Sequence, residues 1–157
     1  MHDVLGYFDN LILVRDREQL IDEIELVKRE IFAVHSATEL EESLQKQLPN
    51  SRAKEFFLYL SKQMKHVYDG HVVEEILESL RGKLMDMDVV SVILATDLSR
   101  PEISEMHARL VSLVEKRILM QIHTEQSLLG GLKLEYNGIY LDLSLATTIK
   151  RMLKQQL

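Results

Sequence analysis

The chain of 157 residues contains no cysteine. Disulfide bonds, thiolate zinc sites, iron–sulfur clusters and cysteine nucleophiles are therefore all excluded. No apolar run approaches the roughly 18 residues that a membrane-spanning helix needs, and no basic region precedes an apolar core near the N-terminus. The sequence therefore predicts neither insertion into a membrane nor an export or transit peptide.

Motifs for phosphate, metal and nucleophilic chemistry are also missing. The sequence has no GxxxxGKS/T loop, no GxGxxG fingerprint and no GxSxG elbow, and no two of its six histidines are spaced i, i+4. Acidic pairs such as Glu74 and Glu75 resemble ordinary helix-surface charges, and nothing marks one of them as a general acid. We therefore predict no catalytic residue, no metal site and no cofactor, which favours a binding or structural module.

Charge is distributed unevenly along the chain. The formal net charge is -6, but residues 1–88 hold 11 basic and 18 acidic groups, whereas residues 89–157 hold 8 basic and 7 acidic groups. This mild acidity argues against nucleic acid or an anionic membrane as the main partner. Because the charge shifts where the hydrophobic period changes, we expect two domains, 1–85 and 89–157, with a boundary at 85–88.

The first 85 residues show the 3.6-residue period of amphipathic helices. Asp16 can cap a helix with one apolar stripe, Thr38 and Glu41 form a capping box, and Ser51 can begin a further helix. Helices are expected over 4–14, 16–34, 38–48, 51–67 and 72–84, which make a compact all-α bundle. The stripes to be buried are Leu20, Ile24, Val27 and Ile31 in the second helix and Val72, Val73, Ile76, Leu80 and Leu84 in the last.

The second part begins with strand, helix and strand. Residues 89–95 form a nearly unbroken apolar run that is typical of a strand buried on both faces. Ser99 and Glu102 predict a helix start with a proline in its first turn, and residues 118–122 predict a second strand that is parallel to the first. The helix is expected to bury Ile103, Met106, Leu110, Leu113 and Val114.

A hairpin and a last helix follow. Asn137 and Gly138 are the strongest short hairpin signal, because both tolerate the positive φ of a type I′ turn. A two-residue loop pairs Tyr136 with Ile139, Leu134 with Leu141 and Leu132 with Leu143 on one face, and pairs Lys133 with Asp142 and Glu135 with Tyr140 on the other. Ser144 then caps a helix whose apolar stripe is Leu145, Ile149, Met152 and Leu153. The predicted fold class is α+β, an N-terminal helical bundle followed by a small β-α-β-β-α domain.

The segment between the second strand and the hairpin carries a pair of glycines. Gly130 and Gly131 precede a strand without a neighbouring lysine, so they indicate a backbone bend and not a phosphate cradle. Around them, in order, stand an aliphatic strand, a polar residue, an apolar residue, the glycine pair, alternating apolar residues and an Asp-x-Ser before the last helix. These residues are Glu125, Leu128, Gly130, Gly131, Leu132, Leu134, Glu135, Asp142 and Ser144.

This pattern resembles the signature of the F-type ATP synthase delta subunit, the homologue of the mitochondrial oligomycin-sensitivity-conferring protein. The resemblance covers about 68 residues, from the strand at 92–99 onward, while the helical half is similar only in kind and shorter than the six-helix domain of the family. It implies a non-catalytic peripheral-stalk (stator) subunit that links the catalytic head to the b subunits and is needed to couple proton translocation to ATP synthesis.

The resemblance also implies partners. The helical domain would bind N-terminal segments of alpha subunits, and the second domain would meet the C-termini of the b subunits in a hetero-oligomeric complex. The expected location is the cytoplasmic face of a bacterial plasma membrane, with attachment only through these partners. For an alpha-subunit helix, the candidate groove residues are Leu5, Phe8, Leu60 and Met64.

Two other classes of function stay open at this point. One is a helical adaptor or regulatory protein that carries a delta-like C-terminal domain, which co-purification with alpha and b subunits would separate from the stator. The other is a small enzyme that uses only carboxylates and histidines, which ligand-induced thermal stabilisation would reveal.

Overall fold

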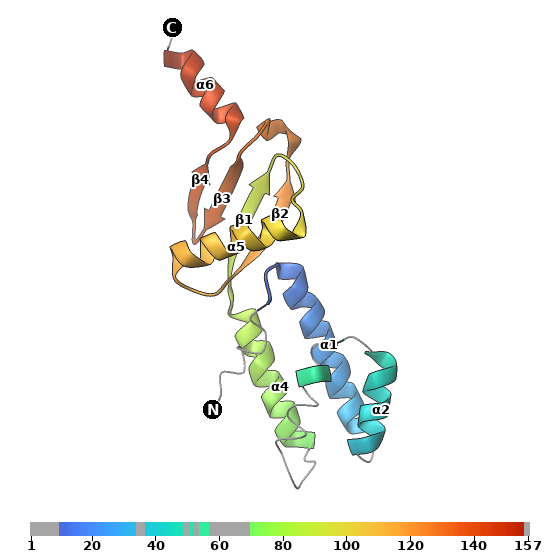
Figure 1. Ribbon diagram of the computed structural model, residues 1–157. Coiled ribbons are helices and arrows are strands. Elements are labelled where there is room, and N and C mark those ends of the chain that lie inside the picture. The colour runs from blue at the N-terminus through green and yellow to red at the C-terminus, as the bar shows by residue number, and fades with distance from the viewer. Residues whose placement is uncertain (1–9, 34–36, 49–50, 52–53, 57–69, 156–157) are drawn as a thin grey trace. The chain divides into compact units, whose positions relative to one another are not determined.

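The computed structural model describes residues 10–33, 37–48, 51, 54–56 and 70–155 (Figure 1). Its mixed helices and strands confirm the predicted α+β class. Among these residues the chain separates into two compact units. One contains residues 15–86, and the other contains residues 87–157 together with Ile12–Val14, a segment that the sequence analysis assigned to the helical domain.

Three helices with assigned bounds make up most of the first unit as described. They are α1 (Val14–Ala33), α2 (Ala37–Gln47) and α4 (Gly70–Met85), and residues 54–56 are also helical. The predicted stripe of α1 is confirmed, because its buried residues are Leu20, Ile24, Val27 and Ile31. These side chains repeat at the helical period, so a single face of α1 supplies the core.

Three predictions for this unit differ from the structure. Helix α1 begins at Val14, so Asp16 lies in its first turn and is not its cap. Helix α2 begins at Ala37, so Thr38 lies inside the helix and is not its cap. The buried face of α4 is shifted by part of a turn, because Leu77 is buried and Val72 is 40% exposed. Its buried stripe is Val73, Leu77, Leu80 and Leu84, spaced i, i+4, i+7 and i+11.

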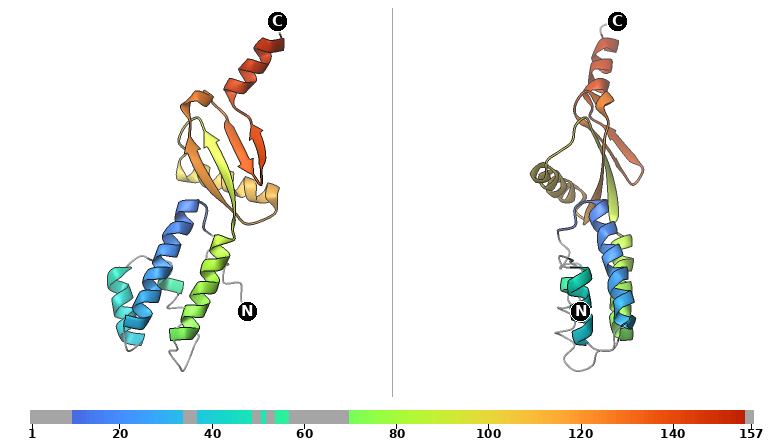
Figure 2. Two further views of the ribbon diagram at one scale, coloured as in Figure 1. Left: turned by 180° about the vertical axis from the view of Figure 1, so that it is seen from behind. Right: turned by 90° about the vertical axis from the view of Figure 1, so that its right-hand side faces the viewer.

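Polar side chains connect the helices of the first unit, and α1 lies between α2 and α4 (Figures 1 and 2). Lys28 on α1 donates a hydrogen bond to Glu78 on α4, and the Ser43 hydroxyl on α2 donates to Glu30 on α1. The hydrogen bond to Glu78 raises the pKa of Lys28. Each of these bonds joins two helices through partly buried groups, so it adds specificity to the apolar packing.

The second unit is built on one four-stranded sheet with the order β2-β1-β3-β4. The strands are β1 (Asp88–Leu94), β2 (Ile118–Thr124), β3 (Leu132–Tyr136) and β4 (Ile139–Asp142). As predicted, β1 and β2 are parallel, while β3 is antiparallel to both β1 and β4. The observed order is β-α-β-β-β-α, so the predicted order β-α-β-β-α is one strand short. The missing strand is one arm of the hairpin, because β3 and β4 both belong to the sheet.

Helix α5 (Arg100–Val114) lies against one face of this sheet (Figure 2). Its predicted capping box is confirmed, since the Ser99 N–H and hydroxyl both donate to Glu102 Oε2, at 2.8 Å and 2.6 Å. Leu110 is buried, but the prediction for Leu113 was wrong because this side chain is 79% exposed. Leu113 lies one position outside the stripe that faces the sheet.

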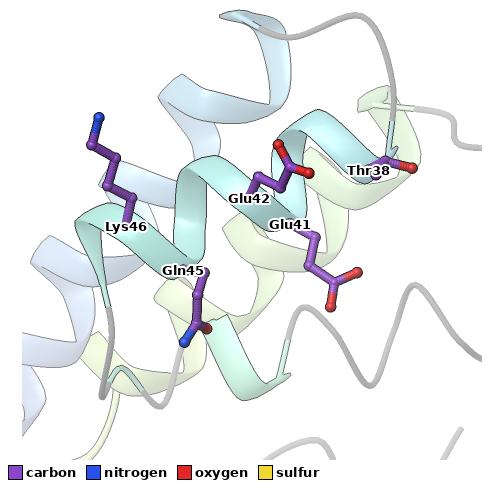
Figure 3. A pocket seen from close by; sticks show the side chains of 5 residues that line it. All are labelled: Thr38, Glu41, Glu42, Gln45 and Lys46. Carbon is purple, nitrogen blue, oxygen red and sulfur yellow. The ribbon is translucent and has the colours of Figure 1, made fainter.

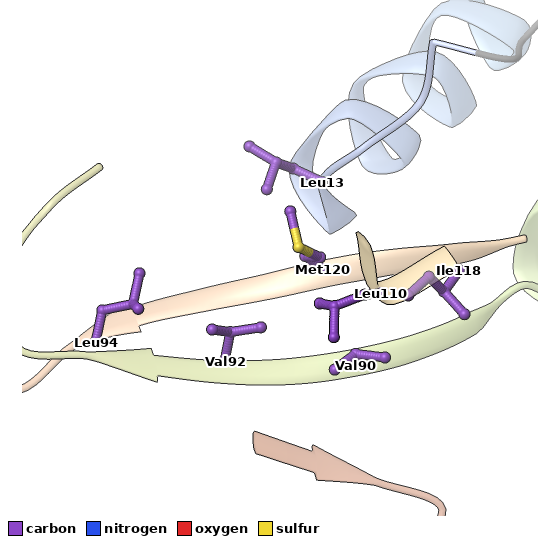
Figure 4. Packing of buried hydrophobic residues seen from close by; sticks show 7 residues of the cluster. All are labelled: Leu13, Val90, Val92, Leu94, Leu110, Ile118 and Met120. Carbon is purple, nitrogen blue, oxygen red and sulfur yellow. The ribbon is translucent and has the colours of Figure 1, made fainter. Parts of the chain in front are cut away.

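Burial alternates along β1, so the prediction of a strand buried equally on both faces was wrong. Val90, Val92 and Leu94 are buried, whereas the residues between them are partly exposed. This is the period of two expected for a strand with one fully covered face. The buried cluster along β1 and β2 comprises Leu13, Val90, Val92, Leu94, Leu110, Ile118 and Met120 (Figure 4).

Leu13 belongs to this cluster although it comes from the start of the chain. It forms a parallel bridge with Met120, and the Met120 N–H donates to the carbonyl of Ile12 at 2.8 Å. Residues 10–13 are not helical, which contradicts the end of the predicted helix 4–14, whose remainder lies outside the described residues. The segment instead lies along the outer edge of β2 and pairs with its backbone groups.

The hairpin has the predicted turn and register. Asn137 and Gly138 have φ of 49° and 77°, the values that a type I′ turn requires. The predicted pairs from Tyr136–Ile139 to Lys133–Asp142 are all present, while the predicted Leu132–Leu143 pair lies beyond the end of the ladder. Leu143, just beyond β4, donates its N–H to the carbonyl of Leu132 at 2.9 Å.

Candidate functional site

The sequence placed a partner groove between helices of the first unit. Its candidate residues Leu5, Phe8, Leu60 and Met64 all lie outside the described residues. The groove therefore stays a prediction.

A hollow of about 540 Å³ lies on the outer side of α2, lined by Thr38, Glu41, Glu42, Gln45 and Lys46. The side chains point in different directions and do not converge on a common point (Figure 3). Helix α2 carries Glu39, Glu41 and Glu42 against Lys46, and Lys54 Nζ also reaches this face, where it donates to Gln45. This arrangement is a negatively charged surface suited to a basic partner segment, and it differs from the mostly apolar pockets with convergent polar groups that hold small ligands.

A second polar group in the first unit surrounds residue 51. The buried Ser51 hydroxyl donates to Glu23 on α1 at 2.8 Å and accepts the N–H of Lys54 at 3.1 Å, as a helix N-cap does. Lys54 is also buried, and its Nζ donates to Gln45 on α2 at 2.8 Å. These bonds fix the chain after α2. Sequence reasoning found the cap at Ser51 but not Glu23 and Gln45, because those contacts are between elements.

The family-signature residues gather at one junction of the second unit, where η2 (Gln126–Leu128), a short 3₁₀ turn, meets β3 and the last helix α6 (Leu145–Gln155). Glu125 precedes the turn, and its N–H donates to the carbonyl of Leu94 at 2.7 Å. Its carboxylate accepts from Ser127 and lies 3.5 Å from Lys133 Nζ. The Ser127 hydrogen bond, followed by the Lys133 charge, lowers the pKa of Glu125. Leu128, the last residue of the turn, is buried.

The glycine pair allows two backbone segments to approach each other. Gly131 has φ +76°, and a Cβ built on it would lie 2.3 Å from the carbonyl oxygen of Leu143. The carbonyl of Gly130 accepts the N–H of Leu145 at 2.9 Å, at the first residue of α6. A side chain at position 131 would push the hairpin end away. The predicted backbone role of these glycines therefore has a specific cause, which is the close passage of residues 143–145.

Asp142 and Ser144 begin α6. Asp142 Oδ1 accepts the Ser144 N–H at 2.9 Å, and its Oδ2 accepts the Thr147 hydroxyl at 2.8 Å. The buried Ser144 hydroxyl accepts the Thr147 N–H at 3.3 Å, which is the geometry of an N-cap. Hydrogen bonds from Ser144 and then Thr147 lower the pKa of Asp142 to about 2.

The other signature residues lie on β3. Leu132 and Leu134 are partly buried against the core cluster, whereas Glu135 is exposed on the opposite face. Glu125, Leu128, the glycine pair, Asp142 and Ser144 connect η2, the hairpin and the start of α6, whereas Glu135 has no part in this junction. The arrangement sets the direction in which α6 leaves the sheet, and it offers no nucleophile or acid–base pair for chemistry.

Membrane spans and metal sites are both absent from the part of the chain that the structure describes. Within the described residues, no helix is both long and apolar enough to cross a membrane. The same part of the chain has no group of three or more histidine, aspartate or glutamate side chains placed to hold a metal ion.

The chain matches the model of a known protein family. No curated protein matches the chain. The model of the family described as ATP synthase delta (OSCP) subunit matches residues 36–157, which are 122 of the 157 residues. The match includes every signature residue at the η2–α6 junction, and it extends upstream into the first unit as far as residue 36.

Proposed function

The chain belongs to the ATP synthase delta (OSCP) subunit family, and from this premise we propose that it is the non-catalytic stator of an F-type ATP synthase. In this role it joins the catalytic head to the b subunits of the peripheral stalk. It holds the head against the torque of the rotor, so that proton flow is coupled to ATP synthesis. The observation that carries the proposal is the family match over the η2–α6 junction and most of the first unit.

The two units suit two different attachments. The helical domain predicted over residues 1–85 binds the head through N-terminal segments of alpha subunits, and its acidic α2 face favours segments with basic flanks. The candidate groove residues Leu5, Phe8, Leu60 and Met64 receive the apolar side of such a segment. The second unit, residues 89–157, binds the C-termini of the b subunits. Attachment to a bacterial plasma membrane, at its cytoplasmic face, is then through these partners alone.

Salt dependence tests the attachment to the head. A synthetic peptide from an alpha-subunit N-terminus should bind the purified chain more weakly as salt rises, because acidic side chains attract its basic flanks. A double Glu41→Gln, Glu42→Gln variant should reduce this salt dependence, and Glu105→Gln on α5 provides a control outside the first unit. Binding that is equally strong at all salt concentrations would contradict the electrostatic part of the proposal.

Co-purification tests the proposed function as a whole. The tagged full chain, recovered from membranes of the source cell, should bring alpha and b subunits with it. The purified chain alone should show no ATP hydrolysis. Recovery of the chain without either subunit would instead favour a separate adaptor protein with a delta-like C-terminal domain.

A further inference from the structure

Exposed apolar side chains are concentrated at the end of the second unit. Of twelve large apolar or aromatic side chains exposed among the described residues, eight lie between residues 129 and 152. Exposed single apolar residues are ordinary, but a cluster of this kind usually marks a surface that a partner covers. Six of the eight form two rows, which are Ile139, Leu141 and Leu143 along β4 and Leu145, Ile149 and Met152 along α6.

The β4 row lies on the same sheet face as the core. Leu134 pairs with Leu141 and Tyr136 with Ile139, so these two exposed β4 residues each have a partly buried β3 partner beside them. Ile139 is 72% exposed, whereas Tyr136 opposite it packs against the core cluster. The apolar face of the sheet therefore continues beyond the part that its own unit covers.

The α6 row continues from the end of β4. Leu145, Ile149 and Met152 are spaced i, i+4 and i+7, so they form one stripe on the helix. Helix α6 projects from the end of the sheet and contacts η2 near its start (Figures 1 and 2). The Gly130–Leu145 hydrogen bond and the Ser144 cap fix this start. The stripe thus begins at a hydrogen-bonded junction, and its apolar side chains are partly exposed to solvent.

The charge of α6 indicates what covers it. The helix carries Lys150, Arg151 and Lys154, and no acidic residue follows Asp142 in the sequence. Lys150 and Arg151 are exposed, and at 100° per residue they lie about 130° to either side of the centre of the stripe, so they act on a partner through the net charge of the helix. A second α6 packed on the stripe would bring like charges together, which disfavours a second copy of this chain. An amphipathic helix with acidic flanks meets both the apolar stripe and the positive charge.

We infer that the β4 row and the α6 stripe form one docking surface for an amphipathic partner helix with acidic flanks. This inference rests on the proposed function, in which the second unit holds helices of the peripheral stalk, and it adds the residues and the partner chemistry. The partner helix lies along α6 with its apolar side against Leu145, Ile149 and Met152. Its acidic flanks are attracted by the positive charge that α6 carries at Lys150, Arg151 and Lys154.

Binding of matched peptides to the purified full chain tests this surface. The probes are a synthetic amphipathic helix with a leucine stripe flanked by glutamates, and the same peptide with lysines in place of the glutamates. The glutamate peptide should bind more tightly than the lysine peptide, with an affinity that falls as salt rises. Equal binding of the two peptides would overturn the inference.

Variants locate the binding on the surface. Ile149→Glu should lower the affinity for the glutamate peptide by about tenfold or more, because it places a negative charge in the centre of the stripe, where it repels the glutamates of the peptide. Leu113→Glu is the matched control, because Leu113 lies on α5 outside the surface and is more exposed than Ile149. The affinity of this variant for the glutamate peptide should stay within about twofold of wild type. Lys150→Glu with Arg151→Glu should reverse the preference between the peptides. Circular dichroism and thermal melts establish that each variant is folded.

Other outcomes have definite meanings. Binding to vesicles of anionic lipid but not to the glutamate peptide would overturn the inference in favour of a membrane surface. Self-association that Ile149→Glu abolishes would overturn it in favour of a second copy. Co-purification separates this failure from failure of the stator proposal. If Ile149→Glu retains b subunits as well as wild type does, the surface is wrong and the stator proposal stands; if wild type retains none, the stator proposal fails.

Discussion

The two units of this chain use different chemistry on their surfaces. The first unit is acidic, with 18 acidic and 11 basic groups in residues 1–88, and its helices are connected by side-chain hydrogen bonds such as Ser51–Glu23. The second is nearly neutral, and its exposed apolar side chains gather on β4 and α6. A chain that joins two partners benefits from this difference, because a segment suited to one surface binds poorly to the other.

The units also differ in how their elements are held in place. In the first unit, side chains connect neighbouring helices. In the second, backbone groups pass close to one another at Gly131, and backbone hydrogen bonds join Gly130 to Leu145 and Ile12 to Met120. Substitutions of glycine should therefore have opposite effects in the two units, and a residue near the start of the chain should support the second unit.

The largest effect is expected for Gly131→Val. A Cβ at this position would lie 2.3 Å from the Leu143 carbonyl oxygen, and the backbone has φ +76°. Strain and overpacking together should lower the free energy of unfolding by about 3–5 kcal/mol, measured by denaturant titration. Gly138→Val is the control, because Gly138 has nearly the same φ with open space around it. A loss for Gly131→Val no larger than for Gly138→Val would show that the close approach is unimportant.

Leu13→Ala should lower the free energy of unfolding by a smaller amount, about 2 kcal/mol, because it truncates a large side chain of the core cluster at the edge of the sheet. Amide hydrogen exchange should show the loss of protection in β2. Leu20→Ala, in the core of the first unit, should instead reduce protection in α1 and α4. If Leu13→Ala loosened only α1, residues 12–14 would not belong to the second unit.

The pH dependence of stability should show the contribution of the Asp142 carboxylate, which accepts hydrogen bonds from Ser144 and Thr147 at the start of α6. Its pKa is about 2 in the folded chain against an ordinary 3.8, so the charged form is favoured by folding. The stabilisation is therefore fully present above about pH 4, and it is lost as the pH falls toward 2. Asp142→Asn should lower the melting temperature at pH 7, and the difference from wild type should vanish near pH 2. Glu135→Gln on β3 is the control. If its melting temperature differed from wild type with the same pH dependence, the effect would not belong to Asp142.

The smallest effect is a gain for Gly82→Ala. Gly82 is exposed within α4, with nothing within 4 Å of a Cβ built on it. Alanine should stabilise the first unit by about 0.5–1 kcal/mol, because glycine loses more backbone entropy in a helix. A thermal melt measures the gain. If Gly82→Ala lowered the stability, as Gly131→Val is expected to do, the contrast between the two units would disappear.

Local patterns in the sequence predicted much of this structure. The stripe of α1, the Ser99–Glu102 capping box and the hairpin register each depend on residues close together in the chain, and all were confirmed. The glycine pair was predicted to bend the backbone, but its partner at Leu143 became known only from the fold.

Contacts over long distances in sequence were not predicted. Leu13 pairs with Met120 across more than a hundred residues, and no local period could indicate this bridge. The α6 stripe was predicted as an apolar face, but a stripe does not tell whether its own chain covers it. The structure leaves Ile149 and Met152 exposed, and this exposure is the basis for the proposed docking surface.

The independence of the two units stays a prediction with a direct test. Residues 1–85 should fold alone into a helical bundle with a helical circular dichroism spectrum. Residues 89–157 lack the segment that pairs with β2, so they should be less stable alone than when residues 12–14 are fused to them. A random-coil spectrum for residues 1–85 would contradict the independence of the first unit.

Coupling of proton flow to ATP synthesis tests the stator proposal most directly. Inverted membrane vesicles from cells that lack this chain should be compared with the same vesicles after the purified chain is added back. Vesicles without the chain should keep ATP hydrolysis by the head but lose proton-driven ATP synthesis, and the added chain should restore synthesis. Proton-driven synthesis at the wild-type rate in vesicles without the chain would contradict the account.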